Sequence, residues 1–489
     1  MDFISWRFIL FFSIVFFLYY FPLKEKGKIQ NILLLIASYF FYGMADYKML
    51  LLLIIATVIF YFIGKAIVTT KNEKNSSLWT NAGIILGLGL LFYFKYFSFF
   101  VSSIMPSSFV GLLNDVGFKV STAELHIIVP LGISFFTFKL ISYVIEVHRR
   151  KMEPTDNFIA FATYIAFFPT IMSGPIDRPN VFIPQLIKKR SFDYDLAVDG
   201  CRQFIWGLFQ KTVIADNLAI YTSQAWSNIQ GSSGGTLFLA ALLYSFQIYT
   251  DFSGYSDMAI GIGKVLGFRI AVNFKYPFFA TNIAEFWRRW HISLTSWLTD
   301  YVFMPLNIKF RNWGKAGIIL AILINMFFVG LWHGANWTYV VFGLYHGLLF
   351  IPLIWSGSFF KKKKTKISPY GLPSIKETLS MAGTFLLVTF GLVIFRAENL
   401  PQAFTFIKNV CMFSGWAEFN FDGMGRVIAT IILLLVFIVV EWWGKKQPYA
   451  LAKIVRFKRP IRWFVYLFLI FLIGMYMQTT QTPFIYFKF

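Results

Sequence analysis

Residues 48–68 read KMLLLLIIATVIFYFIGKAIV, and this stretch decides the class of fold. A helix needs about 20 mostly apolar residues to cross the hydrocarbon core of a bilayer, and this run supplies them. The whole chain shares its character, because 57% of the 489 residues are hydrophobic and 14% are charged, against about 25% charged in soluble domains. This composition excludes a soluble or disordered protein, and two cysteines are too few for a disulfide scaffold. We therefore predict an all-α polytopic membrane protein.

Lys and Arg residues cluster between the apolar runs, and these clusters predict the topology. The net charge of +22 is therefore assigned to cytoplasmic loops and the lipid surface, and we predict no nucleic-acid partner. We predict about eleven spans or part-spans, of which the regular ones lie near residues 8–22, 30–44, 48–68, 80–103, 126–147, 317–331, 335–356, 378–396, 427–443 and 463–479. The basic segments 24–28, 65–74, 148–151, 309–315, 361–366 and 445–462 are then cytoplasmic. Both termini are predicted to be extracytoplasmic, in a multi-pass protein of the cell (inner) membrane.

The middle of the chain, residues 152–310, breaks the regular pattern. Its apolar stretches are short and are interrupted by prolines and by acids such as Asp251 and Asp257. Irregular backbone at membrane depth is stable only where protein buries it or water reaches it. We expect tilted or re-entrant helices around 200–226, 236–250, 253–267 and 281–306. We predict a single membrane domain, 1–489, with N-terminal spans (1–150), a catalytic core (151–356), C-terminal spans (357–480) and a tail (481–489).

His333 is the first candidate for acid–base chemistry among only five histidines. It lies in Gly330-Leu-Trp-His-Gly-Ala-Asn-Trp337, at the tip between two predicted spans. The first arm of about 15 residues rises only about 22 Å, less than the hydrocarbon core, which places His333 inside the membrane slab. There an imidazole could take a proton from a hydroxyl during acyl transfer. A packing role is equally compatible with the residues alone.

His291 is the second candidate and closes Glu285-Phe-Trp-Arg-Arg-Trp-His291. On one helix, Glu285 and Arg289 have the spacing of an ion pair. Arginines beside tryptophans either lie at a polar boundary or bind an anion such as phosphate, and His291 could polarise a carbonyl. His346 follows His333 by thirteen positions, about 220° around a helix, so we do not expect the two to share a face.

The carboxyl-terminal segment Pro483-Phe-Ile-Tyr-Phe-Lys-Phe489 is aromatic where a free tail would be polar. Either it tucks back into a cavity and brings the Tyr486 hydroxyl to the reaction centre, or it forms an interfacial aromatic belt. The chain contains no H-E-x-x-H motif, the pattern typical of zinc hydrolases. We therefore predict no metal, and we expect Asp251 and Asp257 to accept hydrogen bonds from buried donors.

Several motifs together resemble the membrane-bound O-acyltransferase family, in its alginate O-acetylation branch. They are PLGISFFTFKLISYVIEVH (130–148), FPTIMSGPIDRP (168–179), DFSGYSDMAIG (251–261), NFKYPFF (273–279), FWRRWHISLTSWLTD (286–300) and GLWHGANW (330–337). The resemblance implies a helical bundle in which a central funnel meets an inner cavity near His333, with His291 as the second histidine. It also implies cytoplasmic acetyl-CoA as donor. The tail resembles the carboxyl-terminal motif of the small membrane partner in teichoic-acid D-alanylation, where a tyrosine at the position of Tyr486 is implicated in carrying the acyl group.

The hypothesis from the sequence is O-acetylation of a cell-surface polysaccharide, such as an alginate-like exopolysaccharide, across the membrane. His333 is the predicted general base, Tyr486 a relay, and an extracytoplasmic SGNH-type or similar acetyltransferase the partner. The predicted contacts for the donor phosphates are Arg178, Lys188, Lys189 and Arg311. One alternative is D-alanyl transfer to teichoic acid, and another is a polysaccharide transporter, although no internal repeat typical of transporters is visible.

Overall fold

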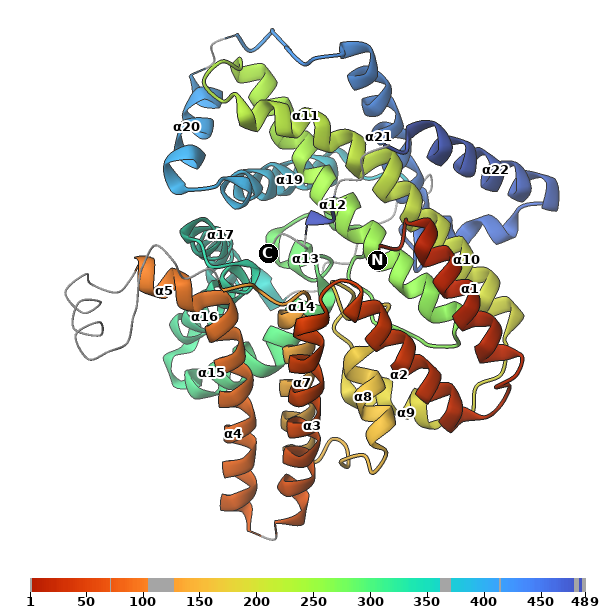
Figure 1. The fold of residues 1–489 in the computed structure, drawn as a ribbon. Coiled ribbons are helices and arrows are strands. Elements are labelled where there is room, and N and C mark those ends of the chain that lie inside the picture. The colour runs from red at the N-terminus through yellow and green to blue at the C-terminus, as the bar shows by residue number, and fades with distance from the viewer. Residues whose placement is uncertain are drawn as a thin grey trace. The chain divides into compact units, whose positions relative to one another are not determined.

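The structure is a computed structural model that describes residues 2–70, 72–103, 127–360, 371–412, 415–478 and 483–485. Over these residues the chain forms helices and connecting segments and contains no strand (Figure 1). It falls into two compact units. The first unit comprises residues 1–201 and 259–271, and the second comprises 202–258 and 272–489. The prediction of a single membrane domain stays a prediction.

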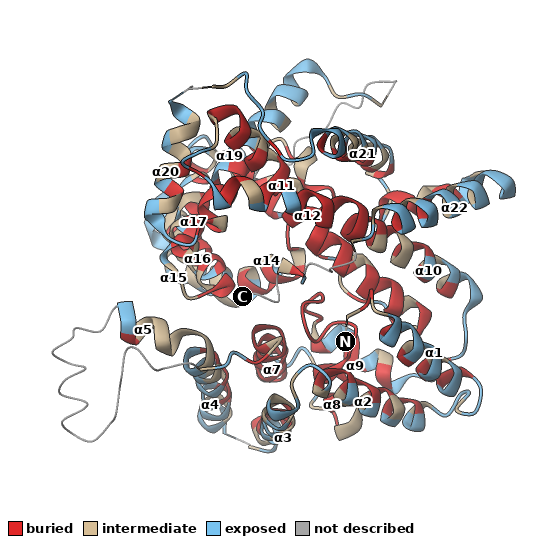
Figure 2. Ribbon diagram, turned by 45° about the horizontal axis from the view of Figure 1, so that its top comes forward, coloured by how far each residue is buried: buried red, intermediate tan, exposed pale blue. Residues whose placement is uncertain are grey.

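The first unit is organised around α7 (Ile133–His148), which is buried along almost its whole length (Figure 2). This helix packs against α3 (Tyr47–Thr69) and α4 (Glu73–Leu91). Asp46 begins α3 by accepting a hydrogen bond from the backbone N–H of Met49, as helix N-caps do. The other helices here are α1 (Trp6–Tyr20), α2 (Gly27–Gly43), α5 (Phe97–Ser103), α8 (Phe158–Ala166) and α9 (Pro179–Ile187). Each of the five predicted N-terminal spans therefore overlaps a helix.

The second unit contains a tight hairpin of α16 (Gly314–His333) and α17 (Trp337–Leu348). Glycines bring these two helices together. A Cβ atom on Gly330 or on Gly343 would lie 2.1 Å or 2.2 Å from a backbone carbonyl oxygen of the opposite helix. The other helices are α11 (Asp216–Ser227), α13 (Ile283–Trp287), α14 (Ile292–Leu298), α15 (Met304–Lys309), α18 (Ile351–Trp355), α19 (Ile375–Arg396), α20 (Leu400–Cys411), α21 (Met424–Gly444) and α22 (Arg459–Tyr476).

Two helices, α10 (Tyr194–Phe209) and α12 (Gly234–Val265), contribute residues to both units. The prediction of two helices, 236–250 and 253–267, was wrong, because α12 runs through both ranges without a break. Gly254 is a packing residue here, since a Cβ atom on it would lie 2.7 Å from the carbonyl oxygen of Gly207 in α10. The close approach of the two helices explains a glycine that costs an isolated helix about 1 kcal/mol.

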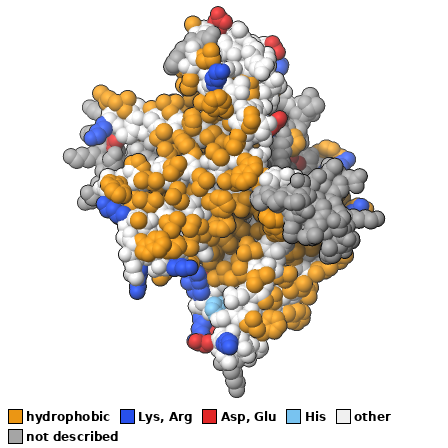
Figure 3. All heavy atoms as spheres, turned by 90° about the vertical axis from the view of Figure 1, so that its left-hand side faces the viewer, with side chains coloured by type: hydrophobic (Ala, Val, Ile, Leu, Met, Phe, Trp, Pro, Cys, Tyr) orange, Lys and Arg blue, Asp and Glu red, His pale blue; other side chains and the backbone are white. Residues whose placement is uncertain are grey.

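Seven helical segments in the described part of the chain are long and apolar enough to cross a membrane. They are Tyr47–Thr69, Glu73–Ser103, Arg311–His333, Trp337–Trp355, Ile375–Arg396, Met424–Gly444 and Arg459–Tyr476, and the shorter Trp6–Tyr20 is also apolar. Large apolar side chains such as Phe62 and Val439 remain exposed on these helices. Figure 3 shows one face on which hydrophobic side chains cover a broad area. Such a surface is that of a multi-pass membrane protein.

Candidate functional site

His291 lies at a break in the helix that was predicted over residues 281–306. Helix α13 ends at Trp287, and His291 precedes α14 with a left-handed backbone, φ +44° and ψ 51°. A residue other than glycine rarely adopts this conformation unless its surroundings impose it. Here Asn273 does so, because its carbonyl oxygen accepts from the N–H of Ile292 (2.8 Å) and its Oδ1 accepts from the hydroxyl of Ser293 (2.6 Å).

His333 is the last residue of α16 and is 3% exposed. The sequence argument for its depth was wrong in its premise. The helix has 20 residues instead of about 15, so it rises about 30 Å and its length alone does not keep His333 below the membrane surface. The surrounding protein encloses His333, which is what a general base shielded from water requires.

The structure brings His291 and His333 together in one aromatic cluster within the second unit. Their ring centroids lie 6.5 Å apart, and the ring of Trp332 lies 5.2 Å from His291 and 5.1 Å from His333. Phe252 of α12 packs against His291 at 4.7 Å, and Phe395 of α19 packs against His333 at 5.0 Å. The two histidines predicted from the sequence therefore lie in one buried cluster, and their role in catalysis stays a prediction.

His346 belongs to the same cluster, which the sequence reasoning missed. The ring of Phe342 lies 6.2 Å from His333 and 4.6 Å from His346, and the indole N–H of Trp287 donates to Nδ1 of His346 (3.4 Å). The angle between two positions on a single helix does not predict that His333 and His346 share the ring of Phe342, because the two histidines lie on different helices of the hairpin. The signal available in the sequence was Gly343, which lets α17 pack tightly against α16.

Burial fixes the protonation state of His291, which lies outside the seven candidate spans. A fully buried imidazolium loses its hydration, and this lowers the pKa of His291 to about 3. At neutral pH the ring is therefore uncharged. One of its nitrogens carries a proton and the other can accept one, as polarisation of a carbonyl or proton transfer requires.

A buried ion cluster lies between α12 and a π-helical stretch, Gln210–Ala215. Nζ of Lys211 lies 2.6 Å from Oδ1 of Asp251 and 2.9 Å from Oδ1 of Asp216, and all three side chains are buried. The expectation for Asp251 and Asp257 is confirmed, because Asp257 also accepts hydrogen bonds from buried amide side chains. π-Helical turns inside α-helices occur often at functional sites.

The carboxyl-terminal tail docks on this ion cluster. The side chain of Phe484 is 1% exposed, with Nζ of Lys211 4.4 Å from its ring centroid and the ring of Tyr255 edge-on at 4.9 Å. The backbone N–H of Ile485 donates to Oδ2 of Asp251 at 2.8 Å. Of the two alternatives for the tail, burial rather than an interfacial belt holds for Phe484. We call Lys211, Asp216, Asp251 and Tyr255 the tail clamp.

The tail clamp lies beside the histidine cluster. Asp251 precedes Phe252 in α12, and Phe252 contacts His291. Tyr486, the predicted relay, lies outside the described residues, and it is the next residue after Ile485 in the chain.

The basic residues predicted to contact the donor phosphates lie in different units. Arg178, at the start of α9, and the exposed Lys188 and Lys189 belong to the first unit. Arg311 is exposed in the second unit. Their role in binding stays a prediction.

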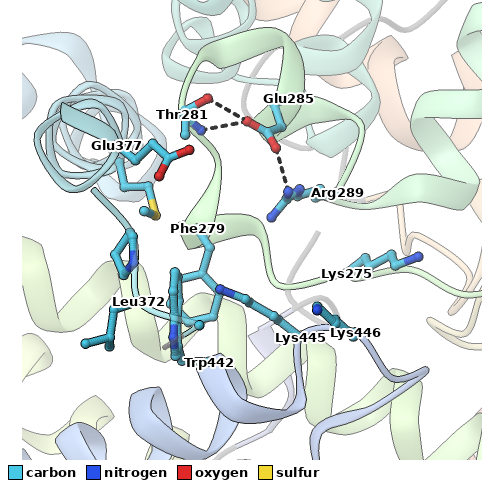
Figure 4. A pocket seen from close by; sticks show the side chains of 13 residues that line it. Lys275, Phe279, Thr281, Glu285, Arg289, Leu372, Glu377, Trp442, Lys445 and Lys446 are labelled. Carbon is cyan, nitrogen blue, oxygen red and sulfur yellow. Dashed lines mark hydrogen bonds and ion pairs between the residues drawn. The ribbon is translucent and has the colours of Figure 1, made fainter. Parts of the chain in front are cut away.

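A pocket of about 390 Å³ opens beside α13 in the second unit (Figure 4). Lys275, Arg289, Lys445 and Lys446 line it. The sequence indicates Arg289 as a candidate anion ligand, whereas it explains Lys445 and Lys446 only as part of a cytoplasmic basic segment. Over the part of the chain that is described, no group of three or more His, Cys, Asp or Glu side chains could hold a metal ion.

Comparisons with known proteins show which proteins the chain is similar to. Residues 149–392, which include His291 and His333, match the sequence model of MBOAT, the membrane-bound O-acyltransferase family. A probable alginate O-acetylase of Pseudomonas aeruginosa is 36% identical over 430 residues, covering 86% of this chain and 78% of the relative. A peptidoglycan O-acetyltransferase of Helicobacter pylori is 33% identical, covering 82% and 77%. A teichoic acid D-alanyltransferase of Bacillus subtilis is 32% identical over 279 residues, covering 55% and 69%.

Proposed function

Because the chain belongs to the membrane-bound O-acyltransferase family, we propose that it moves an acetyl group from cytoplasmic acetyl-CoA to a hydroxyl of an extracytoplasmic polysaccharide. Its similarity to alginate and peptidoglycan O-acetylating enzymes supports acetyl as the group and a cell-surface polysaccharide, such as an alginate-like exopolysaccharide, as the acceptor. The observation that carries the proposal is the joint burial of His291 and His333 beside the docked tail.

In the proposed first step, the hydroxyl of Tyr486 attacks the thioester carbonyl. His333 takes the hydroxyl proton as the new C–O bond forms, and it returns that proton to the sulfur as the C–S bond breaks. The products are an acetyl ester on Tyr486 and free CoA thiol. The uncharged His291 donates a hydrogen bond to the carbonyl oxygen, where negative charge develops.

In the proposed second step, an extracytoplasmic SGNH-type or similar acetyltransferase partner removes the acetyl group. A partner nucleophile attacks the tyrosyl ester, the tyrosine hydroxyl regains its proton, and the partner passes the acetyl group to the polysaccharide. The tail clamp supports this relay, because it holds the residues preceding Tyr486 next to the histidine cluster.

Intact mass of the purified protein after incubation with acetyl-CoA tests the relay. We expect one added acetyl group that maps to the tail peptide and that is absent from the His333→Ala and Tyr486→Phe variants. Tyr486→Phe is the matched control, since it removes only the hydroxyl. Steady release of CoA with acetylated polysaccharide from Tyr486→Phe would exclude the relay and establish direct transfer. Absence of both adduct and CoA release in the native chain would exclude acetyl-CoA as donor.

D-alanyl transfer from a carrier-protein thioester is the second candidate, because the Bacillus subtilis relative is named for it. That similarity covers 55% of this chain, whereas the O-acetylating relatives cover more than four fifths. Family membership favours an enzyme over the transporter alternative. Competing the two labelled thioesters against each other in one assay separates the two acyl donors.

A further inference from the structure

The basic pocket is the concave site formed by Lys275, Arg289, Trp442, Lys445 and Lys446 together with their neighbours. The complete lining is Lys275, Phe279, Thr281, Glu285, Arg289, Gly371, Leu372, Pro373, Glu377, Met381, Trp442, Lys445 and Lys446. Figure 4 shows Glu285 and Arg289 on one side of the pocket and Trp442 and Lys445 on the other. Its volume, about 390 Å³, is within the range of small-molecule sites.

Both carboxylates in the basic pocket are already engaged by the protein. Oε1 of Glu285 pairs with Arg289 at 2.5 Å, and its Oε2 accepts from the N–H and the hydroxyl of Thr281. Glu377 caps its own helix, with Oε2 accepting from the N–H and the hydroxyl of Ser374. These acids fix the walls of the pocket, and four cations against two carboxylates leave it with an excess of positive charge.

In the described part of the chain none of the three lysines forms a salt bridge, and the carboxylate whose charge acts on Lys445 is Glu377. Lys275 and Lys446 are exposed at the rim, and Lys445 lies over the ring of Trp442. Burial, with the nearby charges of Lys446 and Arg289, lowers the pKa of Lys445 below its usual range. Cations that repel one another in this way are stabilised when an anion enters between them.

The backbone links the basic pocket directly to the histidine cluster. The N–H of Lys275 donates to the carbonyl oxygen of Arg289 at 3.0 Å, and the N–H of Ile292 donates to that of Asn273 at 2.8 Å. These two hydrogen bonds pair residues 273–275 with residues 289–292. Lys275 and Arg289 lie at the pocket end of this pairing, and Asn273 and His291 lie at the other end. On α13, Glu285 faces the pocket, whereas the indole of Trp287 bonds His346.

From this arrangement we propose that the basic pocket binds the phosphate groups of the acyl donor's nucleotide end, through Lys275, Arg289, Lys445 and Lys446. The inference rests on the proposed function and locates its donor site. Phe279 and Trp442, which pack edge to face at 5.0 Å, supply an aromatic wall for the base. Because α13 runs from Glu285 in the pocket to Trp287 beside His346, we place the thioester end of the donor toward the histidine cluster.

The pocket's place in the chain favours a cytoplasmic ligand. Its walls include the start of α19 and the residues that follow α21, and both adjoin segments with the clustered Lys and Arg of cytoplasmic loops, 361–366 and 445–462. An anionic lipid headgroup offers the same phosphate chemistry from the membrane, so the test includes it. The pocket's link to the histidines favours the donor.

The test compares Lys275→Glu/Lys446→Glu with the native chain in phosphatidylcholine vesicles, by the rate at which CoA or pantetheine thiol is released in the first turnover, which needs no partner protein. KM and kcat here are the half-saturating donor concentration and the limiting rate of that turnover. Two donors are used, acetyl-CoA and acetyl-pantetheine, which carries the thioester without phosphates. We expect the KM for acetyl-CoA to rise about tenfold or more, since charge-assisted contacts to its phosphates are lost, with kcat unchanged. The KM for acetyl-pantetheine should not change. Lys376→Glu, an exposed change in α19 outside the pocket, should leave both donors unaffected.

Three outcomes would overturn the assignment of the pocket, and a fourth would overturn the proposed function as well. An unchanged KM for acetyl-CoA in the double variant, with normal turnover of the native chain, rejects the pocket and leaves the proposed function standing. If the double variant differs from the native chain only when phosphatidylglycerol is added to the vesicles, the ligand of the pocket is a lipid headgroup. A raised KM in Lys188→Glu/Lys189→Glu instead places the phosphates at those residues. If the native chain releases thiol from neither donor, the proposed function fails as well.

Discussion

His291 combines full burial with a left-handed backbone, so a substitution there can change both chemistry and folding. Asparagine adopts this conformation more readily than other residues with a side chain. We expect His291→Asn to keep the melting temperature in detergent close to that of the native chain and to lower acetyl transfer by about 10²–10⁴-fold, the usual contribution of a positioned acid or base. His291→Ala should lower both the melting temperature and acetyl transfer. Normal turnover by a folded His291→Asn variant would reduce His291 to a packing residue.

The site residues that the sequence predicts lie in short recognisable motifs, whereas those that it misses depend on contacts between distant segments. His291 and His333 lie in short motifs dense in tryptophan and glycine, which could be recognised without knowing the fold. His346 lies in Gly343-Leu-Tyr-His-Gly347, which has the two glycines of the His333 motif but no tryptophan, and its place depends on the packing of α17 against α16. Lys445 and Lys446 had a sufficient explanation as a cytoplasmic cluster, and only the pocket shows that they face Arg289.

At the scale of helices, hydropathy predicted where most spans lie but not how they end or join. The runs near 48–68 and 427–443 correspond closely to α3 and α21. The continuity of α12 and the full length of α16 were missed, because glycine and charged residues ended the apolar pattern before the helix itself ended. At those points the helix continues because it packs against neighbouring helices, which hydropathy along the sequence does not report.

The α16–α17 hairpin holds His333, so its packing should control activity. Gly343→Ala places a methyl group 2.2 Å from a backbone oxygen of α16, and we expect a loss of about 1–3 kcal/mol in stability together with lower acetyl transfer. Gly383→Ala in α19 is the matched control, because nothing lies within 4 Å of its added Cβ and the helix gains stability from alanine. Thermal unfolding in detergent checks both. Equal melting temperatures for the two variants would contradict the close approach.

For the whole molecule, the proposed chemistry requires that donor and acceptor arrive from opposite sides of the membrane. The basic pocket must open toward acetyl-CoA in the cytoplasm, and the loop before α21 must lie outside if the helices alternate as their flanking charges indicate. The two proposals therefore depend on one orientation of the chain, which labelling can measure directly.

Cysteine labelling of a chain without Cys201 and Cys411, which are both exposed, tests that orientation. In intact cells a membrane-impermeant maleimide should label Asp422→Cys, in the loop before α21. Lys26→Cys and Lys446→Cys should react only after permeabilisation, because both belong to basic segments predicted to be cytoplasmic, and all three positions are exposed. Labelling of Lys446→Cys in intact cells would show that the basic pocket faces the outside of the cell, where acetyl-CoA is absent. The donor site and the direction of transfer would then both fail, although His291 and His333 would remain one site.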